Sequence, residues 1–447
     1  MARDLTKGSI PGHIFALAIP ALFSMFAIVV NNFVNTALVG HLGDAELAAV
    51  GSAGFVIWIL FSIMEIFSVG TVAILSRDYG AMNYKEASEK SMDILRFSIL
   101  FSIFLGALGI LFSGKIFHLL HLEPEVEQMG RVYLLIIFFS VPFLFLSEVV
   151  SAIFRAIGDT KTPMMIMITA VGMNIVLDIF LIYGVWIFPR LETKGAAIST
   201  SIAHTTSALL GFFFVLKGKI PFRIIPQKLK PTNLSVIRAL FRIGLPISIA
   251  SIVFSLVYLV LTRIMSNFGT QAVAAIPAGN RAESLSYMTC FSFYIAASSM
   301  VGQNLGAGKS ERATRSTWTA VGIVSLLTLL FTGVFLLFSQ EITSILTNEP
   351  DVKIIASSYL RILAISQVFM GFEFVLEGAL TGAGQTLPPT LVSIPGTLFR
   401  IPLAYYLAIS LGIGPSGIFW AITFSTILKG TSILIWFQKG RKKFYLK

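Results

Sequence analysis

Six carboxylates of this 447-residue chain stand inside long apolar stretches, where an ionised side chain is costly. At the centre of a bilayer one charge costs ~2.5–3.5 kcal/mol even on the lenient insertion scale. Such side chains therefore face the protein interior or water, and they are candidates for binding an ion or a substrate, although an ion pair between helices would also account for each. The six are Glu65, Glu148, Asp178, Glu283, Glu373 and Glu377.

The stretch "GMNIVLDIFLIYGVWIF" (172–188) places Asn174 and Asp178 four residues apart, so they share one face of a helix. Lysine and arginine stand only near the ends of the apolar stretches of the first half, so we expect Asp178 and Glu148 to lack a permanent counter-ion. Two such carboxylates close together would hold at least one proton, because burial and a like charge both favour the neutral form. A site that holds a proton or a Na⁺ ion is what an ion-coupled antiporter needs. For Glu65 a functional and a structural role stay open.

In the second half Glu373 and Glu377 are also four residues apart. Two ionised carboxylates one turn apart repel, so one is protonated or a cation lies beside them. Arg400 and Arg281 are the possible basic partners, and Glu283 could join either network. A buried Arg–Glu pair that holds two helices together and a role in substrate binding remain open alternatives.

The elements that carry these residues are predicted to be membrane-spanning helices. The chain is 55% hydrophobic and 12% charged, with a mean hydropathy of +0.84, which indicates a polytopic all-α membrane protein. A span needs about 20 mostly apolar residues. Twelve segments qualify: 13–38, 47–76, 95–118, 131–155, 162–188, 196–216, 243–267, 272–301, 316–339, 354–380, 388–411 and 416–437.

Basic residues predict the orientation and the division of the chain. Most lysines and arginines fall in connections on the same side of the membrane as the N terminus, which predicts that both termini are cytoplasmic. This bias accounts for the net charge of +11 without a nucleic-acid partner. The longest polar connection, 217–242, is predicted to be a cytoplasmic linker between an N-terminal lobe (1–216) and a C-terminal lobe (243–447).

The two halves repeat each other at one constant offset in residue number. Pro20 aligns with Pro246, Gly43 with Gly269, Gly80 with Gly306 and Pro163 with Pro389. Six spans per half is an even number, so the repeats are predicted to be parallel and related by a pseudo-two-fold axis along the membrane normal. That architecture is typical of transporters that rock two halves around a substrate cavity.

Several kinds of chemistry are absent from the sequence. A single cysteine, Cys290, excludes a disulfide framework, and five histidines without zinc-like spacing indicate no structural metal. The sequence contains no GxxxxGK[ST] phosphate loop, no nucleophile elbow and no HExxH motif, so we expect neither direct ATP hydrolysis nor enzymatic activity, and no cofactor beyond a coupling ion.

Nearly the whole chain resembles the MATE family, the multidrug and toxic compound extrusion transporters, of the prokaryotic type. The motifs that carry the resemblance are "LAIPALFSMF", "NTALVGHLGDAELAAVG", "RAIGDTKTPMM", "GMNIVLDIFLIYG", "KGAAISTSIA", "GLPISIA", "VGQNLGAGKSERA" and "LTGAGQTLPP". The resemblance implies two six-helix lobes and export of amphipathic, often cationic organic compounds in exchange for H⁺ or Na⁺.

The resemblance also implies a cation site in the N-terminal lobe, onto which Asn174, Asp178 and Thr200 carry over. The aspartate that the family places on its first helix is replaced here by Asn35. We hypothesise that Glu148 supplies the second carboxylate instead. The acidic position that some relatives have on the seventh helix is Phe254 here, so no coupling site is carried over to the C-terminal lobe.

The sequence thus predicts a monomeric multi-pass antiporter in the inner membrane of a prokaryote, which binds a small amphipathic or cationic molecule. Two alternatives stay open. A flippase for lipid-linked sugars has related architecture, but its anionic cargo would favour a basic cavity rather than the acidic interior of the first half. A passive channel or a scaffold without transport is the other.

Overall fold

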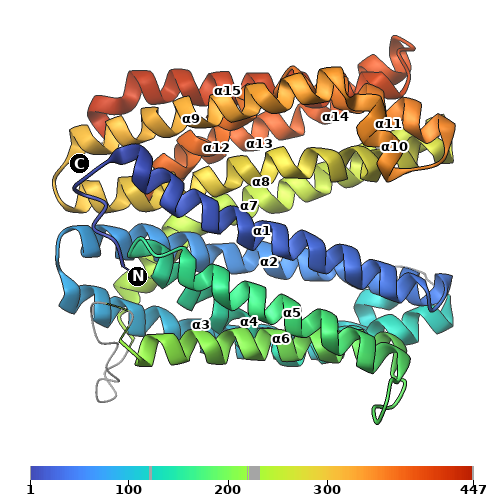
Figure 1. Ribbon diagram of the computed structural model, residues 1–447, viewed down its shortest axis with the longest axis horizontal. Coiled ribbons are helices and arrows are strands. Elements are labelled where there is room, and N and C mark those ends of the chain that lie inside the picture. The colour runs from blue at the N-terminus through green and yellow to red at the C-terminus, as the bar shows by residue number, and fades with distance from the viewer. Residues whose placement is uncertain (1, 120–122, 219, 221–231, 445–447) are drawn as a thin grey trace. The chain divides into compact units, whose positions relative to one another are not determined.

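All regular elements of the described residues are helices, which confirms the predicted all-α fold (Figure 1). The computed structural model describes residues 2–119, 123–218, 220 and 232–444. Part of the predicted linker, residues 219 and 221–231, therefore lies outside the described residues. The predicted lobe boundaries at 216 and 243 stay predictions.

The first half of the chain forms six long helices. They are α1 (Ile10–Gly40), α2 (Asp44–Gly80), α3 (Tyr84–Leu119), α4 (Pro124–Ala156), α5 (Lys161–Tyr183) and α6 (Glu192–Leu216). The second half is divided into more and shorter elements, and Pro395 and Pro402 stand on either side of the break between its helices at Phe399. It comprises α7 (Leu234–Met265), η1 (Ser266–Phe268), α8 (Thr270–Gly306), α9 (Ser310–Leu337), α10 (Ser339–Leu346), α11 (Pro350–Ala364), α12 (Gln367–Gly382), α13 (Leu387–Leu398), α14 (Arg400–Tyr405), η2 (Tyr406–Ser410) and α15 (Pro415–Phe444).

The helix bounds reproduce the repeat that the sequence predicts. Both ends of α8 follow those of α2 at the offset that aligns Pro20 with Pro246. The start of α11 and the end of α12 follow the two ends of α4 at the same offset. Where α4 is continuous, its counterpart bends by 58° between α11 and α12. The match therefore extends beyond the aligned motifs to whole helices.

Ten helices of the described residues are long and apolar enough to cross a membrane, and the bent pair α11–α12 raises the number to at most eleven. The predicted eighth span, 272–301, lies within α8, which is 37 residues long but is not among them. Its first half carries Asn280, Arg281 and Glu283, which lower its hydropathy. The predicted number of twelve spans therefore stays a prediction.

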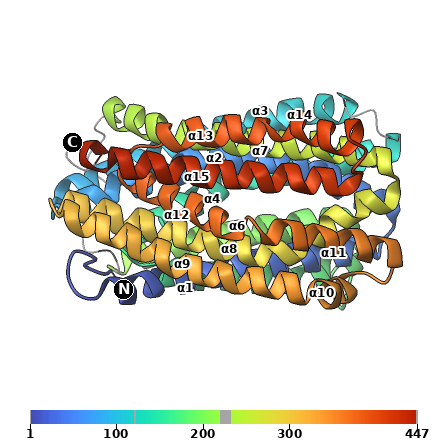
Figure 2. The ribbon, with the colours of Figure 1, turned by 90° about the horizontal axis from the view of Figure 1, so that it is seen from above.

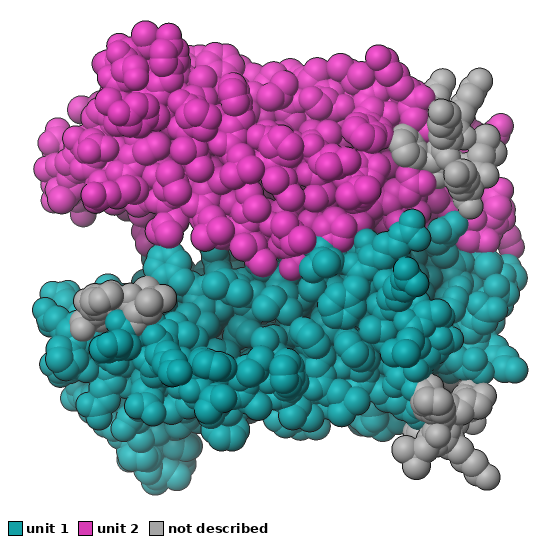
Figure 3. Space-filling view, turned by 180° about the vertical axis from the view of Figure 1, so that it is seen from behind, with its two compact units in different colours: residues 1–4, 23–245 teal, residues 5–22, 246–447 magenta. Residues whose placement is uncertain are grey.

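The chain divides into two compact units, coloured separately in Figure 3: unit 1 comprises residues 1–4 and 23–245, and unit 2 comprises residues 5–22 and 246–447. In unit 1, α4 packs against α2, α3 and α6, and α5 packs against α6. In unit 2, α12 packs against α8, α9 and α15 (Figure 2). The central helices of the two units, α4 and α12, are counterparts in the repeat.

The turn between α4 and α5 fixes where α5 begins. Asp159 accepts hydrogen bonds from the backbone N–H groups of Lys161 (3.1 Å) and Thr162 (3.0 Å) and from the Thr162 hydroxyl (2.8 Å). These groups would otherwise lack partners at the helix start. Burial acts to raise the pKa of Asp159, but the positive N-terminal amine and the hydrogen bonds from Thr162 outweigh burial and hold the pKa below its ordinary value.

A small-xxx-small pair brings α12 against α8. Gly378 and Gly382 are four residues apart, and a Cβ on either would collide with the α8 backbone at Tyr294 and Ser298. Small residues at this spacing let two helix backbones approach closely within a membrane.

We expect Gly378→Leu to destabilise the protein by about 1–3 kcal/mol, because the added side chain overpacks this contact. The apparent Tm of purified protein in detergent measures the loss. Gly172→Ala is the control, because a Cβ at Gly172 meets no atom within 4 Å. Equal Tm values for both variants would show that the α8–α12 contact tolerates a side chain.

Candidate functional site

Asp178 lies on α5 with its side chain fully buried in unit 1. The Ser199 hydroxyl of α6 donates a hydrogen bond to Asp178 Oδ1, and the Asn35 amide of α1 donates to Oδ2 at 3.3 Å. Among the described residues no lysine or arginine forms an ion pair with Asp178, so the side chains that contact its carboxylate there are neutral.

Gly195 explains how Ser199 reaches Asp178. A Cβ at Gly195, one turn before Ser199 on α6, would lie 2.5 Å from the backbone oxygen of Leu181 on α5. Only glycine permits this approach, which brings the two helices together beside the carboxylate. The contact is a product of packing between α5 and α6.

Asn174 lies one turn before Asp178 and is 1% exposed. Neither its amide nitrogen nor its amide oxygen has a hydrogen-bond partner among the described residues. Buried polar groups are nearly always hydrogen-bonded, so an orphaned amide beside a buried carboxylate needs an explanation. Carboxylate and amide oxygens are ligands for hard cations, so the pair could hold Na⁺, and the carboxylate alone could hold a proton.

Thr200 faces a residue that the sequence did not single out. The Tyr133 hydroxyl of α4 is hydrogen-bonded to Thr200, and Tyr133 lies close enough to Asp178 to interact with its charge. Ser199 was also missed, although it directly precedes Thr200. The sequence shows only that the repeat aligns Tyr133 with Tyr359, and the structure shows that Tyr359 also stands in a polar cluster.

Glu148 corrects one expectation. Its Oε1 lies 2.5 Å from Arg155 Nη2, so the prediction that Glu148 lacks a basic partner is wrong. The two residues are seven positions apart on α4, which puts them on one helix face two turns apart. Arg155 also donates to the Ser68 hydroxyl of α2 at 2.9 Å. The acidic pair of Glu148 with Asp178 stays a prediction.

The remaining acid of unit 1, Glu65, lies on α2 with its side chain partly buried. The hydrogen bonds of the described residues do not join it to Asp178. Asp178 is therefore the acid that Asn35 and Ser199 contact and that Asn174 precedes by one turn.

In unit 2 the acid Glu373 pairs with a base other than the expected Arg400. Lys429 Nζ of α15 lies 2.7 Å from Glu373 Oε1, and both residues are buried. Glu377 is close enough to Lys429 to interact with its charge. The expectation that Arg400 or Arg281 supplies the ion pair of Glu373 is wrong for this contact. The reason is that α12 packs against α15, which carries Lys429.

Glu283 of α8 belongs to a separate cluster. It accepts hydrogen bonds from the Tyr359 hydroxyl (2.5 Å) and from the Gln367 amide (3.3 Å). Tyr359 also contacts the Asn280 amide oxygen (2.6 Å). Arg281, which stands two residues before Glu283 in the sequence, is exposed on α8.

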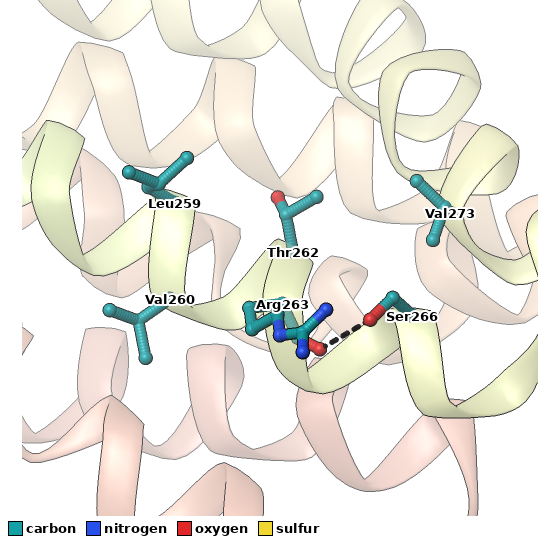
Figure 4. Close-up of a pocket in the computed structure, with 6 residues that line it drawn as sticks. All are labelled: Leu259, Val260, Thr262, Arg263, Ser266 and Val273. Carbon is teal, nitrogen blue, oxygen red and sulfur yellow. Dashed lines mark hydrogen bonds between the residues drawn. The ribbon is translucent and has the colours of Figure 1, made fainter. Parts of the chain in front are cut away.

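A groove of about 530 Å³ opens in unit 2 beside the end of α7 (Figure 4). The residues that line it are Leu259, Val260, Thr262, Arg263, Ser266 and Val273. The Ser266 hydroxyl donates to the Arg263 backbone oxygen at 2.8 Å across its edge (Figure 4). None of the predicted site residues lines this groove.

Comparison with known proteins identifies the family. A family model described as MatE matches residues 20–180 and 246–406, two segments that start at the aligned prolines Pro20 and Pro246. The chain is 28% identical over 434 residues to a probable multidrug resistance protein NorM of Thermotoga maritima, covering 96% of this chain and 92% of that protein.

Solved structures show the same fold. The structure of a MOP superfamily transporter from Pyrococcus furiosus matches with a TM-score of 0.92 and 21% identity, covering 99% of this chain and 98% of that one. A crystal structure of MATE in complex with MaL6 matches with a TM-score of 0.93 and 20% identity, covering 99% of each chain. With the family model matched twice over most of the sequence, this chain belongs to the MatE family of multi-pass membrane transporters.

Proposed function

We propose that this transporter is a secondary active multidrug efflux antiporter. It exports amphipathic or cationic organic compounds in exchange for H⁺ or Na⁺, and Asp178 is its coupling residue. The relative from Thermotoga maritima is named a probable multidrug resistance protein, which supports this class of cargo. We also place the chain in the inner membrane as a monomer, with both termini cytoplasmic.

The observation that carries the proposal is a fully buried carboxylate without a basic partner among the described residues. Asp178 is contacted by the neutral side chains of Asn35 and Ser199, which stabilise its charge without cancelling it. A buried charge left in this way favours uptake of a proton or a cation. The orphaned amide of Asn174, one turn away, would supply a further oxygen for a cation.

The exchange follows from competition for this charge. When the site is open to the outside, Asp178 takes up H⁺ or Na⁺ and becomes neutral, which weakens the hold on a cationic cargo. The cargo leaves, and the ion-loaded protein rocks toward the cytoplasm, where the lower ion concentration empties the site. A ligand can drive such a change only by binding the two states with different affinity. Protonation of Asp178 provides that difference.

Reconstituted transport tests the proposal. We expect proteoliposomes that contain the protein to move ethidium against its gradient when a pH gradient or a Na⁺ gradient is imposed, and to stop when the gradient is collapsed. The two gradients are applied separately, so the response identifies the coupling ion. Ethidium flux that ignores both gradients would indicate a channel, and no flux would favour a scaffold or a flippase.

A further inference from the structure

Arg400 is a buried cation with an unused donor. It is the first residue of α14 and is 3% exposed. Its Nε donates to the Ser425 hydroxyl at 3.0 Å, and its Nη2 donates to the Thr426 hydroxyl at 3.2 Å, both on α15. The Tyr258 hydroxyl of α7 also lies close enough to the guanidinium to interact with it, whereas Nη1 has no hydrogen-bond partner among the described residues. Since buried donors are nearly always paired, Nη1 is a candidate contact for a ligand.

The charge of Arg400 is also left without a direct partner. Among the described residues, no carboxylate lies within ion-pair distance of its guanidinium. Glu373 is engaged by Lys429 at 2.7 Å. Glu283 interacts with Arg400 only through its field, because its oxygens accept from Tyr359 and Gln367. A buried charge without a contacting counter-charge is unfavourable, and a bound anion would relieve it.

Two aromatic rings of α7 flank the guanidinium. The centre of the Phe254 ring lies 5.6 Å from Arg400 Cζ, and that of Tyr258 lies 5.9 Å away. The two rings are tilted against each other with centres 4.8 Å apart, and both side chains are only partly buried. A planar aromatic ligand could pack on these rings while its charged end meets the guanidinium.

The repeat shows how the charge at the Arg400 position differs from that at the equivalent position of unit 1. It aligns Asn174 with Arg400, and Asp178 with Ala404. Asn174 and Arg400 thus occupy equivalent positions, and each keeps an unpartnered buried polar atom. In unit 1 an acid stands beside that atom, whereas in unit 2 alanine replaces the acid and arginine replaces the amide. A position suited to a cation in unit 1 is therefore suited to an anion in unit 2.

We propose that Arg400 binds the carboxylate of an aromatic organic anion, with the rings of Phe254 and Tyr258 packed against the aromatic part. A guanidinium presents a planar fork of donors that matches a carboxylate, so Nη1 would donate to one of its oxygens. The proposal concerns binding at Arg400 alone, and it depends neither on the cargo nor on the ion coupling of the proposed antiport function.

Binding of two matched probes to the purified full chain in nanodiscs tests this site. 2-Naphthoate and its neutral analogue 2-naphthamide are titrated calorimetrically without an ion gradient. We expect wild type to bind naphthoate about tenfold or more tighter than naphthamide, and Arg400→Gln to lose that preference. Arg315→Gln, which removes an exposed arginine of α9 in the same unit, is the control and should keep it.

Arg400→Lys provides a second variant that retains the charge but not the fork, and we expect it to keep part of the preference. Size-exclusion chromatography checks that each variant is folded. Equal affinity of wild type for the two probes, or an unchanged preference in Arg400→Gln, would overturn the proposal. If inorganic phosphate at the same concentration displaced naphthoate, the proposed packing of the ligand on the Phe254 and Tyr258 rings would be contradicted. Because no gradient is applied, none of these results depends on whether Asp178 couples transport to an ion.

Discussion

Asp178→Asn is expected to fold and reach the membrane but to lose ion-driven efflux. The substitution keeps the size of the side chain and one oxygen that can accept from Ser199, while it replaces the oxygen that accepts from Asn35 by an amide nitrogen and removes the charge that takes up the ion. Removing even an outer partner of a metal ligand typically costs roughly 10–100-fold in affinity. We expect the loss here to be at least as large, since Asp178 would bind the ion directly. Ethidium efflux from proteoliposomes under an imposed gradient measures it.

Two comparisons make this result specific. Asp44→Asn removes the same charge from an exposed position at the start of α2 that makes no hydrogen bond with Asp178, and it should leave efflux unchanged. Glu148→Gln tests the predicted acidic pair, and loss of ion dependence in this variant would support it. If Glu148→Gln transports normally, Glu148 serves its ion pair with Arg155. Efflux by Asp178→Asn at the wild-type rate would refute the coupling role of Asp178.

The helices and the repeat could be predicted from the sequence because their signals are local and repeated. Apolar length indicates a span wherever charges are few, as in α9, which contains a long apolar run. In α8 the same signal is weaker, because Asn280, Arg281 and Glu283 stand inside it; the predicted segment 272–301 is helical, but its role as a span stays a prediction. Polar residues that other helices cover lower the hydropathy of a helix without preventing it from forming. In α8, Glu283 is covered in this way by Tyr359 and Gln367.

The candidate site was predictable where one helix carries both residues. Asn174 and Asp178 share a face of α5 by spacing alone, whereas the contact of Asn35 with Asp178 joins positions 143 apart and depends on tertiary packing. Glu148 and Arg155 are also on one helix, yet their pairing was missed. Arg155 stands near the end of its span. A long arginine side chain can reach back two turns and place its charge beside polar groups, here those of Glu148 and Ser68.

The partners of the unit 2 acids could not be predicted for a related reason. Lys429 and Glu373 are 56 residues apart, on α15 and α12. A single sequence does not show which helix lies beside which. Gly396 of α13 leaves room for the Lys429 side chain, because a Cβ there would collide with Lys429 Cγ. The pair is therefore a product of three helices whose packing the sequence pattern alone does not determine.

Lys429→Met is expected to destabilise the protein by about 3–5 kcal/mol, because it leaves the Glu373 carboxylate buried without its partner. Glu373→Gln should lower the stability by a similar amount, because it leaves the Lys429 ammonium buried without its partner. The double variant Glu373→Gln, Lys429→Met leaves no buried charge at either position, so we expect it to recover most of the stability. Thermal unfolding of the purified proteins in detergent measures all three.

Lys85→Met, which removes an exposed lysine near the start of α3, is the control and should unfold like wild type. The recovery in the double variant is the informative quantity, because it separates the coupling of the two charges from the packing of either side chain. If the double variant is as unstable as the sum of the single ones, the two residues stabilise unit 2 independently. If both single variants are as stable as wild type, the pair contributes nothing and water or Glu377, which is close enough to Lys429 to feel its charge, compensates for the missing partner.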